Sequence, residues 1–207
     1  MNPLRRPFRY RYDNITLILV VLNGLVFLLQ RIYPAAGGYA ALTPALALNG
    51  WVWQFVTYMF VHGGFDHILL NMLALFIFGH QVERHMGSRE FLLYYLLTGI
   101  LAGVFSFVVY LLTGAYWVHL LGASGAIFAV QFAYAVFFPQ SRIYLWGILP
   151  LRAPVMVLGF TGIELVSSIF GRRDGVAHLT HLAGFAFGWL YFVARFSINP
   201  WKELTRR

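Results

Sequence analysis

The run VHLLGASGAIFAVQFAYAVFF at residues 118–138 contains no aspartate, glutamate, lysine or arginine. About 20 apolar residues in a helix cross the hydrocarbon core of a bilayer, so this run predicts a transmembrane helix. Five more runs fit the same pattern, although the second and fifth helices carry polar side chains. The six expected helices are residues 15–32, 67–82, 91–112, 118–138, 153–170 and 178–196. The sequence therefore predicts an all-α membrane protein built as a six-transmembrane-helix bundle.

The composition of the 207 residues agrees with a lipid environment. Hydrophobic residues make up 60% of the chain and charged residues only 11%, against about 25% charged residues in a soluble domain. The mean hydropathy is +0.70. The formal net charge of +8 is concentrated at the two ends, in MNPLRRPFRYR and WKELTRR. Basic ends that flank apolar spans mark the cytoplasmic side and suit an anionic lipid surface, so we expect no nucleic-acid partner.

The charge pattern and the helix count together predict the layout of the chain. We expect a basic cytoplasmic segment at 1–14, a membrane domain at 15–196 and a basic cytoplasmic tail at 197–207. An even number of helices places both termini on the same side, and their basic residues assign that side to the cytoplasm. Residues 37–64 are too interrupted to span, yet they are apolar and aromatic. This loop between the first two helices should lie partly in the membrane interface.

Polar side chains gather where three of the expected helices begin. His67 and Asn71 open the second helix, Ser124 opens the fourth, and His178 and His181 open the sixth. With cytoplasmic termini, these helices all start at the outer face. The polar groups then share one depth, at most about 10 Å below the surface at 1.5 Å per residue. Polar groups inside a membrane are costly and typically functional, so their agreement in depth predicts a site.

The residue types at this depth suit nucleophilic catalysis. A serine hydroxyl becomes a nucleophile when a neutral histidine accepts its proton, and Ser124 has candidate bases nearby. His67 and Asn71 are four residues apart, hence on one helical face, and both can donate hydrogen bonds to an oxyanion. Gly122 and Gly125 would let a substrate backbone come close and let helices pack tightly.

Each of these residues also has a structural interpretation. Ser124 between glycines could be a small-residue packing site, and His67 could be a satisfied interfacial histidine. The histidines of the sixth helix could cap it, or bind a metal together with His62 or Asp66. The HExxH motif is absent and the chain has no cysteine, so we expect neither a metal nor a cofactor.

Four motifs, in the right order, resemble those of the rhomboid intramembrane serine proteases. They are HGGFDHILLNM at 62–72, ERHMG at 83–87, GASGA at 122–126 and HLAGFAFG at 181–188. The resemblance covers roughly Trp51 to Gly188. It implies that Ser124 is the nucleophile and His181 the base, as a dyad without an acid, and that His67 and Asn71 form the oxyanion hole.

The resemblance also implies supporting roles and shows two departures. The supporting residues are Gly122, Gly125, Phe128, His62, Gly184 and Gly188, and the ERHMG segment is expected to be a structural ion-pair site. Many members place an arginine after the tryptophan of the interfacial loop, where this chain has Gln54. Many also place a tyrosine where this chain has Phe128, which keeps the ring that stacks on the base but loses the hydroxyl.

The implied activity is intramembrane serine endopeptidase. The expected substrates are single-span or multi-span membrane proteins in the lipid bilayer, cut near the outer end of a transmembrane segment. The expected location is a bacterial inner membrane. A non-proteolytic rhomboid-like protein that binds membrane clients is the alternative, whereas a transporter is disfavoured because no half of the chain is duplicated. His178 and Glu164 receive no role, although pairing of Glu164 with a polar group in the bundle is favoured over catalysis.

Overall fold

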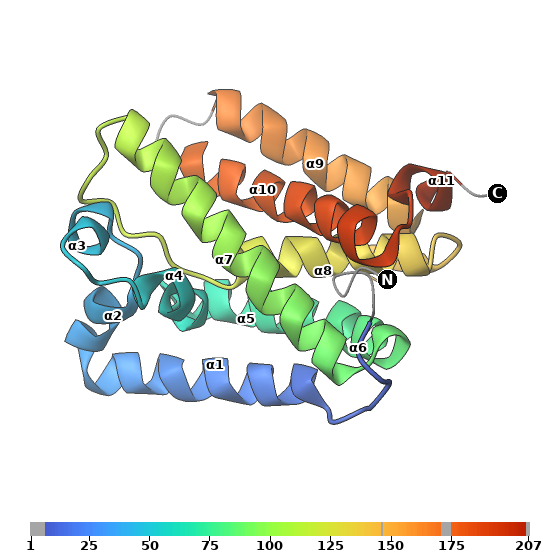
Figure 1. Ribbon diagram of the computed structural model, residues 1–207, viewed down its shortest axis with the longest axis horizontal. Coiled ribbons are helices and arrows are strands. Elements are labelled where there is room, and N and C mark those ends of the chain that lie inside the picture. The colour runs from blue at the N-terminus through green and yellow to red at the C-terminus, as the bar shows by residue number, and fades with distance from the viewer. Residues whose placement is uncertain (1–6, 146, 171–174, 206–207) are drawn as a thin grey trace.

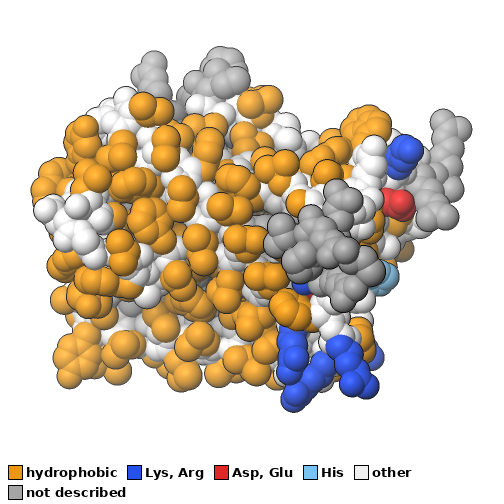
Figure 2. All heavy atoms as spheres, in the orientation of Figure 1, with side chains coloured by type: hydrophobic (Ala, Val, Ile, Leu, Met, Phe, Trp, Pro, Cys, Tyr) orange, Lys and Arg blue, Asp and Glu red, His pale blue; other side chains and the backbone are white. Residues whose placement is uncertain are grey.

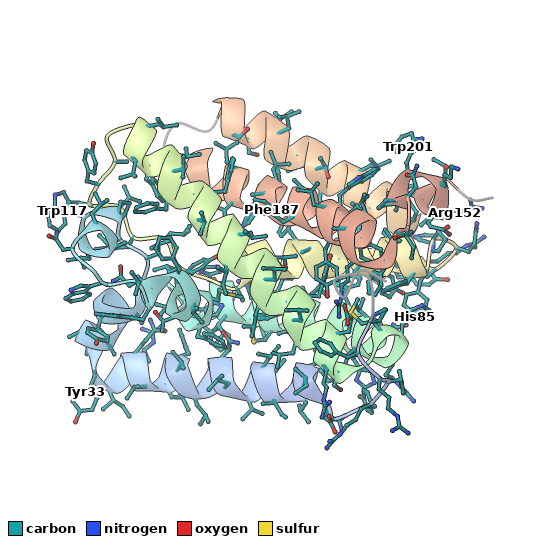
Figure 3. The ribbon with its side chains drawn as sticks, viewed as in Figure 1. Tyr33, His85, Trp117, Arg152, Phe187 and Trp201 are labelled. Atoms are coloured by element: carbon teal, nitrogen blue, oxygen red, sulfur yellow. The ribbon has the colours of Figure 1, made fainter. Side chains whose placement is uncertain are left out.

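The computed structural model describes residues 7–145, 147–170 and 175–205. Predictions that fall on residues 1–6, 146, 171–174 and 206–207 lie outside the described residues. The first helix, α1 (Ile15–Ile32), begins at the same end of the bundle as the C-terminal helix α11 (Pro200–Leu204) (Figure 1). His85, Arg152 and Trp201 lie at this end, which we call the basic end, and Tyr33 and Trp117 lie at the opposite end (Figure 3).

Three helical segments of the described chain are long and apolar enough to cross a membrane. They are α1, the segment Phe65–Met86 and α7 (Ser88–Leu112). The second consists of α5 (Phe65–Ala74), a π-helical turn η3 (Leu75–Gly79) and α6 (His80–Met86). The remaining helices are α8 (Ser124–Phe137), α9 (Ala153–Phe170) and α10 (Gly175–Tyr191), which continues into the π-helical η4 (Phe192–Phe196). That these three also span the bilayer stays a prediction.

The observed helix bounds correct several expected ones. Helices α1 and α9 begin and end where the sequence predicted. The second helix runs from residue 65 to 86 instead of 67–82, because its polar last turns remain helical beyond the apolar run. The third begins at 88 instead of 91. It follows directly after Gly87, whose φ of +87° interrupts the helical conformation between α6 and α7. The sixth begins at 175 instead of 178.

The largest correction concerns the fourth helix, which was expected over 118–138 and begins only at Ser124. The preceding residues are not helical: Leu120 pairs with Leu42 through two backbone hydrogen bonds of 2.9 Å each. Gly122 then has a φ of +114°, a conformation that glycine adopts without strain. Ser124 is therefore the first residue of its helix, whereas the expected helix began six residues earlier.

The fold also contains a small sheet that the all-α prediction missed. Strands β1 (Arg142–Leu145) and β2 (Leu149–Arg152) form an antiparallel hairpin between α8 and α9. Gly147, with a φ of +72°, lies in its turn. Arg152, at the end of β2, lies at the basic end (Figure 3). Pairing of two short strands depends on the turn geometry, and hydropathy alone does not report it.

The interfacial loop forms short helices packed on aromatic rings. Its elements are α2 (Pro34–Ala40), α3 (Pro44–Leu48), α4 (Gln54–Thr57) and the 3-10 helix η2 (Tyr58–Phe60). Gln54 is fully buried, accepts a hydrogen bond from the Thr43 N–H at 3.1 Å and donates to the Tyr39 carbonyl at 3.2 Å. Gln54 stands where the resemblance implies an arginine, and its side-chain amide joins two segments of the loop by hydrogen bonds.

The ERHMG segment caps a helix where an ion pair was expected. Both carboxylate oxygens of Glu83 accept backbone N–H groups at the start of α1, from Ile15 at 2.7 Å and Thr16 at 2.8 Å. The Ser88 hydroxyl also donates to this carboxylate. The first N–H groups of a helix lack intrahelical partners, so a carboxylate there is stabilising. Among the described residues, Glu83 forms no salt bridge.

The surface is that of an integral membrane protein. Hydrophobic side chains cover most of the face in Figure 2, and lysines and arginines gather at the basic end. On α1, the side chains of Leu17, Leu25 and Leu28 are each more than half exposed. Soluble monomers rarely expose so continuous an apolar surface, since the largest patch on a typical monomer is about 300–600 Å². These faces are suited to contact lipid.

Candidate active site

Helices α8 and α10 approach so closely that only glycine fits between them. A Cβ added to Gly184 would lie 2.1 Å from the Gly125 carbonyl oxygen, and one added to Gly188 would lie 3.5 Å from the Ala129 Cα. A Cβ on Gly125 itself would meet Thr180 of α10 at 3.4 Å. Small residues allow this backbone approach in a membrane, where helices associate by packing. The contact brings the start of α8 against α10.

Ser124 and His181 lie on the two sides of this contact. The Ser124 Oγ and the His181 Nε2 are 2.8 Å apart, within hydrogen-bond distance. The His181 side chain is 20% exposed and Ser124 is partly buried, so both are reachable without being solvated like surface groups. A nucleophile and a base at this separation can transfer a proton directly.

Phe128 fixes the plane of the His181 ring. The two rings are parallel within 10°, with centroids 4.3 Å apart. Phe128 lies one turn after Ser124 on α8 and also packs edge-on against Phe185 of α10. The aromatic face therefore orients the imidazole without any hydroxyl, as expected for the phenylalanine at this position.

His67 lies beside the nucleophile across Gly122. A Cβ at Gly122 would be 2.8 Å from the His67 Nε2 and 3.9 Å from the Ser124 Oγ, so the absence of a side chain leaves space between these groups. The Gly63 N–H points to the His67 Nδ1 at 3.4 Å. An acceptor role for Nδ1 leaves the proton of a neutral His67 on Nε2, which then faces this space as a donor.

Asn71 and His62 flank His67. The Asn71 Nδ2 donates a 2.8 Å hydrogen bond to the His67 carbonyl, and the side chain is buried. The His62 ring lies edge-on to the His67 ring at 5.1 Å and is almost fully buried. Burial, followed by the neighbouring His67, lowers the pKa of His62 to about 4, so its imidazole is neutral at physiological pH. Neither Asn71 nor His67 hydrogen-bonds Ser124 among the described contacts.

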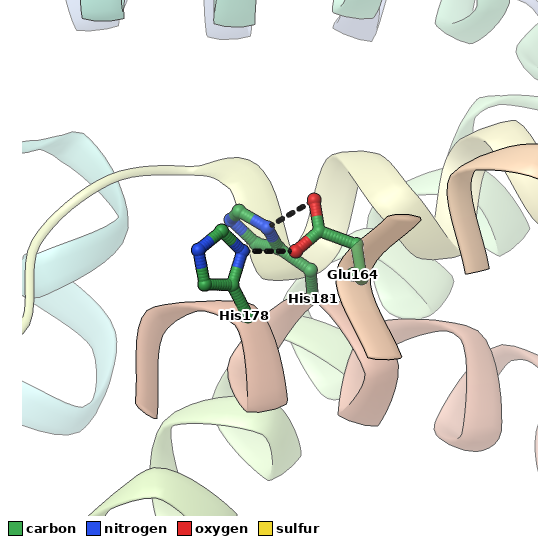
Figure 4. A group of neighbouring side chains, drawn as sticks. All are labelled: Glu164, His178 and His181. Atoms are coloured by element: carbon green, nitrogen blue, oxygen red, sulfur yellow. Dashed lines mark hydrogen bonds and ion pairs between the residues drawn. The ribbon is translucent and has the colours of Figure 1, made fainter. Parts of the chain in front are cut away.

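Glu164 and His178 complete a group around His181 (Figure 4). The Glu164 Oε2 is 2.6 Å from the His178 Nδ1, and its Oε1 is 3.1 Å from the His181 Nδ1. Sequence reasoning gave neither residue a role, although the acid within an apolar helix was expected to pair with a polar group. His178 contacts the acid and not Ser124, consistent with its expected position as a neighbour of the base.

The same three side chains are the donor set that could hold a metal. One ligand atom from each of Glu164, His178 and His181 lies within 4.8 Å of the others. The metal interpretation raised from the sequence joined these histidines to His62 or Asp66 instead, and neither belongs to this group. Two histidines and a glutamate are a known zinc donor set, but here both Nδ1 atoms already face carboxylate oxygens.

Comparison with known proteins identifies the family. A family model described as the Rhomboid domain matches residues 49–198. The chain belongs to the rhomboid family. The putative rhomboid protease YdcA of Bacillus subtilis is 35% identical over 136 residues, which are 66% of this chain and 65% of that relative. The rhomboid protease GlpG of Haemophilus influenzae is 28% identical over 186 residues, 89% of this chain and 92% of its own.

A third relative, the rhomboid protease AarA of Providencia stuartii, is 26% identical over 209 residues, 87% of this chain and 72% of its own. A dyad without an acid was expected, yet Glu164 lies 3.1 Å from the Nδ1 of the candidate base. The sequence shows an acidic residue, Glu164, within the apolar fifth helix. Its partners on the sixth helix are evident only from the three-dimensional structure.

Proposed function

We propose that this rhomboid is an intramembrane serine endopeptidase in which Ser124 is the nucleophile and His181 the general base. The observation that carries the proposal is the 2.8 Å separation of the Ser124 Oγ and the His181 Nε2 inside an apolar helix bundle. The family supports it, because its named relatives are proteases. An inactive client-binding protein would be expected to lack one of the reacting groups, and here both Ser124 and His181 are present and adjacent.

The proposed reaction is an acyl transfer in two stages. The Ser124 Oγ attacks the scissile carbonyl carbon while its proton passes to the His181 Nε2. The tetrahedral intermediate collapses, the C–N bond breaks, and the Nε2 proton moves to the leaving amine. Water then attacks the acyl ester, giving one proton to Nε2, and the ester C–O bond breaks as Oγ takes that proton back. His181 and Ser124 are thus returned to their starting states.

The proposed oxyanion hole combines side chains with the start of α8. Ser124 is the first residue of its helix, so its backbone N–H lacks an intrahelical partner and sits at the positive end of the helix dipole. The His67 Nε2 faces the same space across Gly122, and Asn71 follows one turn along α5. Preorganised donors of this kind stabilise a developing oxyanion more than they would in water.

The proposed substrates are transmembrane segments of single-span or multi-span membrane proteins. The reacting residues lie where α8 begins, and this helix runs toward the basic end (Figure 1). With the basic termini in the cytoplasm, the scissile bond would lie near the outer end of the substrate helix. That bond must leave its helix to be attacked, so residues that ease unwinding, such as glycine, should mark the cleavage site. The proposed location is a bacterial inner membrane.

A combined labelling and cleavage experiment tests this function. The purified protein is reconstituted in liposomes with a panel of single-span substrates, and the cut positions are mapped by mass spectrometry. We expect cleavage near the outer end and labelling by a fluorophosphonate probe that is lost in Ser124→Ala. Binding of substrates without cleavage or labelling would favour the client-binding alternative, and cuts at the cytoplasmic end would overturn the orientation.

A further inference from the structure

Glu164 is the acid that lies against the proposed base. It projects from the apolar helix α9 with only 12% of its side chain exposed. A carboxylate in such surroundings is unfavourable unless it is paired. Its pairs are the Nδ1 atoms of His178, at 2.6 Å, and His181, at 3.1 Å (Figure 4). Both partners are on α10, so the acid is directed at the active site and not at lipid.

This pairing decides which nitrogen of His181 carries the proton. An ionised carboxylate only accepts hydrogen bonds, so the nitrogen that faces it is favoured as the protonated one. With the proton on Nδ1, the Nε2 of a neutral imidazole has a free lone pair, and this atom lies 2.8 Å from the Ser124 Oγ. The opposite tautomer would donate to Ser124 and could not accept its proton.

We propose that Glu164 is a positioning residue that keeps His181 in the Nδ1-protonated tautomer and stabilises the imidazolium formed during catalysis. The inference deepens the proposed function and rests on it. His178 acts on the acid: its hydrogen bond to Oε2 holds the carboxylate so that Oε1 faces His181. The group then consists of Ser124, His181 and Glu164 in the order nucleophile, base and orienting acid.

The proton and charge movements are consistent with this role. Protons pass only among the Ser124 Oγ, the His181 Nε2, the leaving amine and water, while the Nδ1 proton stays on His181. Glu164 remains ionised and forms no covalent bond. At rest the 3.1 Å contact is not aligned as a hydrogen bond, since the His181 Nδ1 lacks an aligned partner. Catalytic hydrogen bonds are often long in the free enzyme and tighten as charge develops.

Two competing roles make different predictions. Glu164 could serve only to stabilise the packing of α9 against α10. In that case its loss lowers the free energy of unfolding and leaves the kcat of the folded protein unchanged. The three side chains could instead hold a divalent cation. In that case, a chelator would remove the activity of the wild-type protein and the cation would restore it.

The kinetic test compares Glu164→Gln, which keeps the shape and removes the charge, with Ser168→Ala. Ser168 is one turn further along α9 and donates to the Leu165 carbonyl of its own helix, its one hydrogen bond among the described residues, so it controls for changes in that helix. We expect Glu164→Gln to lower kcat by about 10²-fold, with 10⁴-fold as the upper limit set by loss of the acid in a serine–histidine–acid triad. KM should stay near its wild-type value. Glu164→Asp should recover about tenfold over Gln because it restores the charge at a slightly wrong distance.

A spectroscopic measurement of the His181 tautomer tests the inference independently of proteolytic activity. Ring-nitrogen NMR of labelled histidines, with the His181 signal assigned by its loss in His181→Gln, reports the tautomer without any turnover. We expect a protonated Nδ1 in the wild type and in Ser168→Ala, and loss of that preference in Glu164→Gln. A bare Nδ1 in the wild type would overturn the inference even for an inactive protein. Wild-type kcat in folded Glu164→Gln, or a chelator-sensitive wild type, would overturn it while leaving serine catalysis intact.

Discussion

Glu90 and Glu164 are both glutamates on apolar helices, α7 and α9, yet their surroundings differ. Glu90 is fully buried on α7, where Arg195 donates from Nε at 2.7 Å and Nη2 at 3.0 Å. The Tyr191 hydroxyl and the Phe8 N–H also donate to it. Glu164 has two histidine partners and remains partly exposed. One acid is enclosed by a permanent cation and fixed donors, and the other by groups that can gain and lose protons.

The difference separates holding the fold from performing chemistry. The Glu90 network joins the N-terminal segment, α7 and the end of α10 with every carboxylate oxygen occupied, so it has no capacity left for a substrate. The Glu164 group has a loose 3.1 Å contact at the atom that would face a developing charge. Variants at the two sites should therefore separate activity from stability, and the predictions below test that separation in order of decreasing effect.

The largest effect is expected at the reacting pair. Ser124→Ala removes the nucleophile and His181→Ala removes the base, so each should abolish proteolysis, by about 10⁴–10⁶-fold. Neither residue takes part in the Glu90 network, and the thermal unfolding midpoint should stay close to that of the wild type. The measurement is substrate cleavage in liposomes together with unfolding in detergent. Activity of more than a few per cent in either variant would show that the pair is wrongly assigned.

The oxyanion donors should have an intermediate effect. Loss of one donor typically lowers the rate about 10²–10³-fold, and we expect this for His67→Ala, whose Nε2 lies across Gly122 from Ser124. Asn71→Ala should lose less, because the Asn71 amide is partly committed to the His67 carbonyl. Single-turnover cleavage rates would measure both. A larger loss in Asn71→Ala than in His67→Ala would reverse the proposed order of the donors.

Glu90→Gln should show the opposite behaviour to the catalytic variants. It leaves the Arg195 cation beside a neutral partner at a buried position, which should lower the free energy of unfolding by about 3 kcal/mol. The kcat of the folded fraction should not change, because the Glu90 partners Tyr191 and Arg195 lie ten or more residues beyond His181, about 15 Å or more along the helix at 1.5 Å per residue. Denaturant titration in mixed micelles and active-site titration measure the two quantities. A stable variant with reduced kcat would contradict the separation of the two acids.

Much of the site could be predicted from sequence because its signals are local. Ser124 lies between two glycines and His181 precedes Gly184, and each of these short patterns predicts close helix packing from the residues of one helix alone. The observed 2.8 Å contact agrees with the predicted pairing. The apolar runs likewise predicted where α1 and α9 begin and end.

The features that sequence reasoning missed depend on contacts between distant segments. The start of α8 is set by the Leu42–Leu120 bridge and the φ of Gly122, not by hydropathy. The contact between Glu164 and His181 depends on the rotation and register of α9 against α10, which no periodicity within either helix specifies. The capping of α1 by Glu83 similarly joins residues 67 and 68 positions apart.

The smallest effect is expected at His62, which lies beside His67 and is buried in its neutral form. Its pKa is lowered from 6.5 to about 4, chiefly by burial. Between these values the unfolded chain binds a proton at this residue and the folded protein does not. Stability should therefore be complete above pH 6.5 and fall as the pH decreases toward 4, by at most about 3 kcal/mol from this residue.

The variant His62→Gln removes that titration, so its free energy of unfolding should vary less with pH than that of the wild type between pH 6.5 and 4. His119→Gln is the matched control, because it removes an exposed histidine, whose Nδ1 is 2.6 Å from the Thr43 hydroxyl, and leaves the buried one in place. The measurement is the unfolding free energy of the three proteins at several pH values in the same detergent. Because other groups titrate in all three proteins, the difference between the curves isolates His62. Identical pH dependence in His62→Gln and the wild type would mean that His62 is solvated in the folded protein, and the site would then be more open to water than its burial indicates.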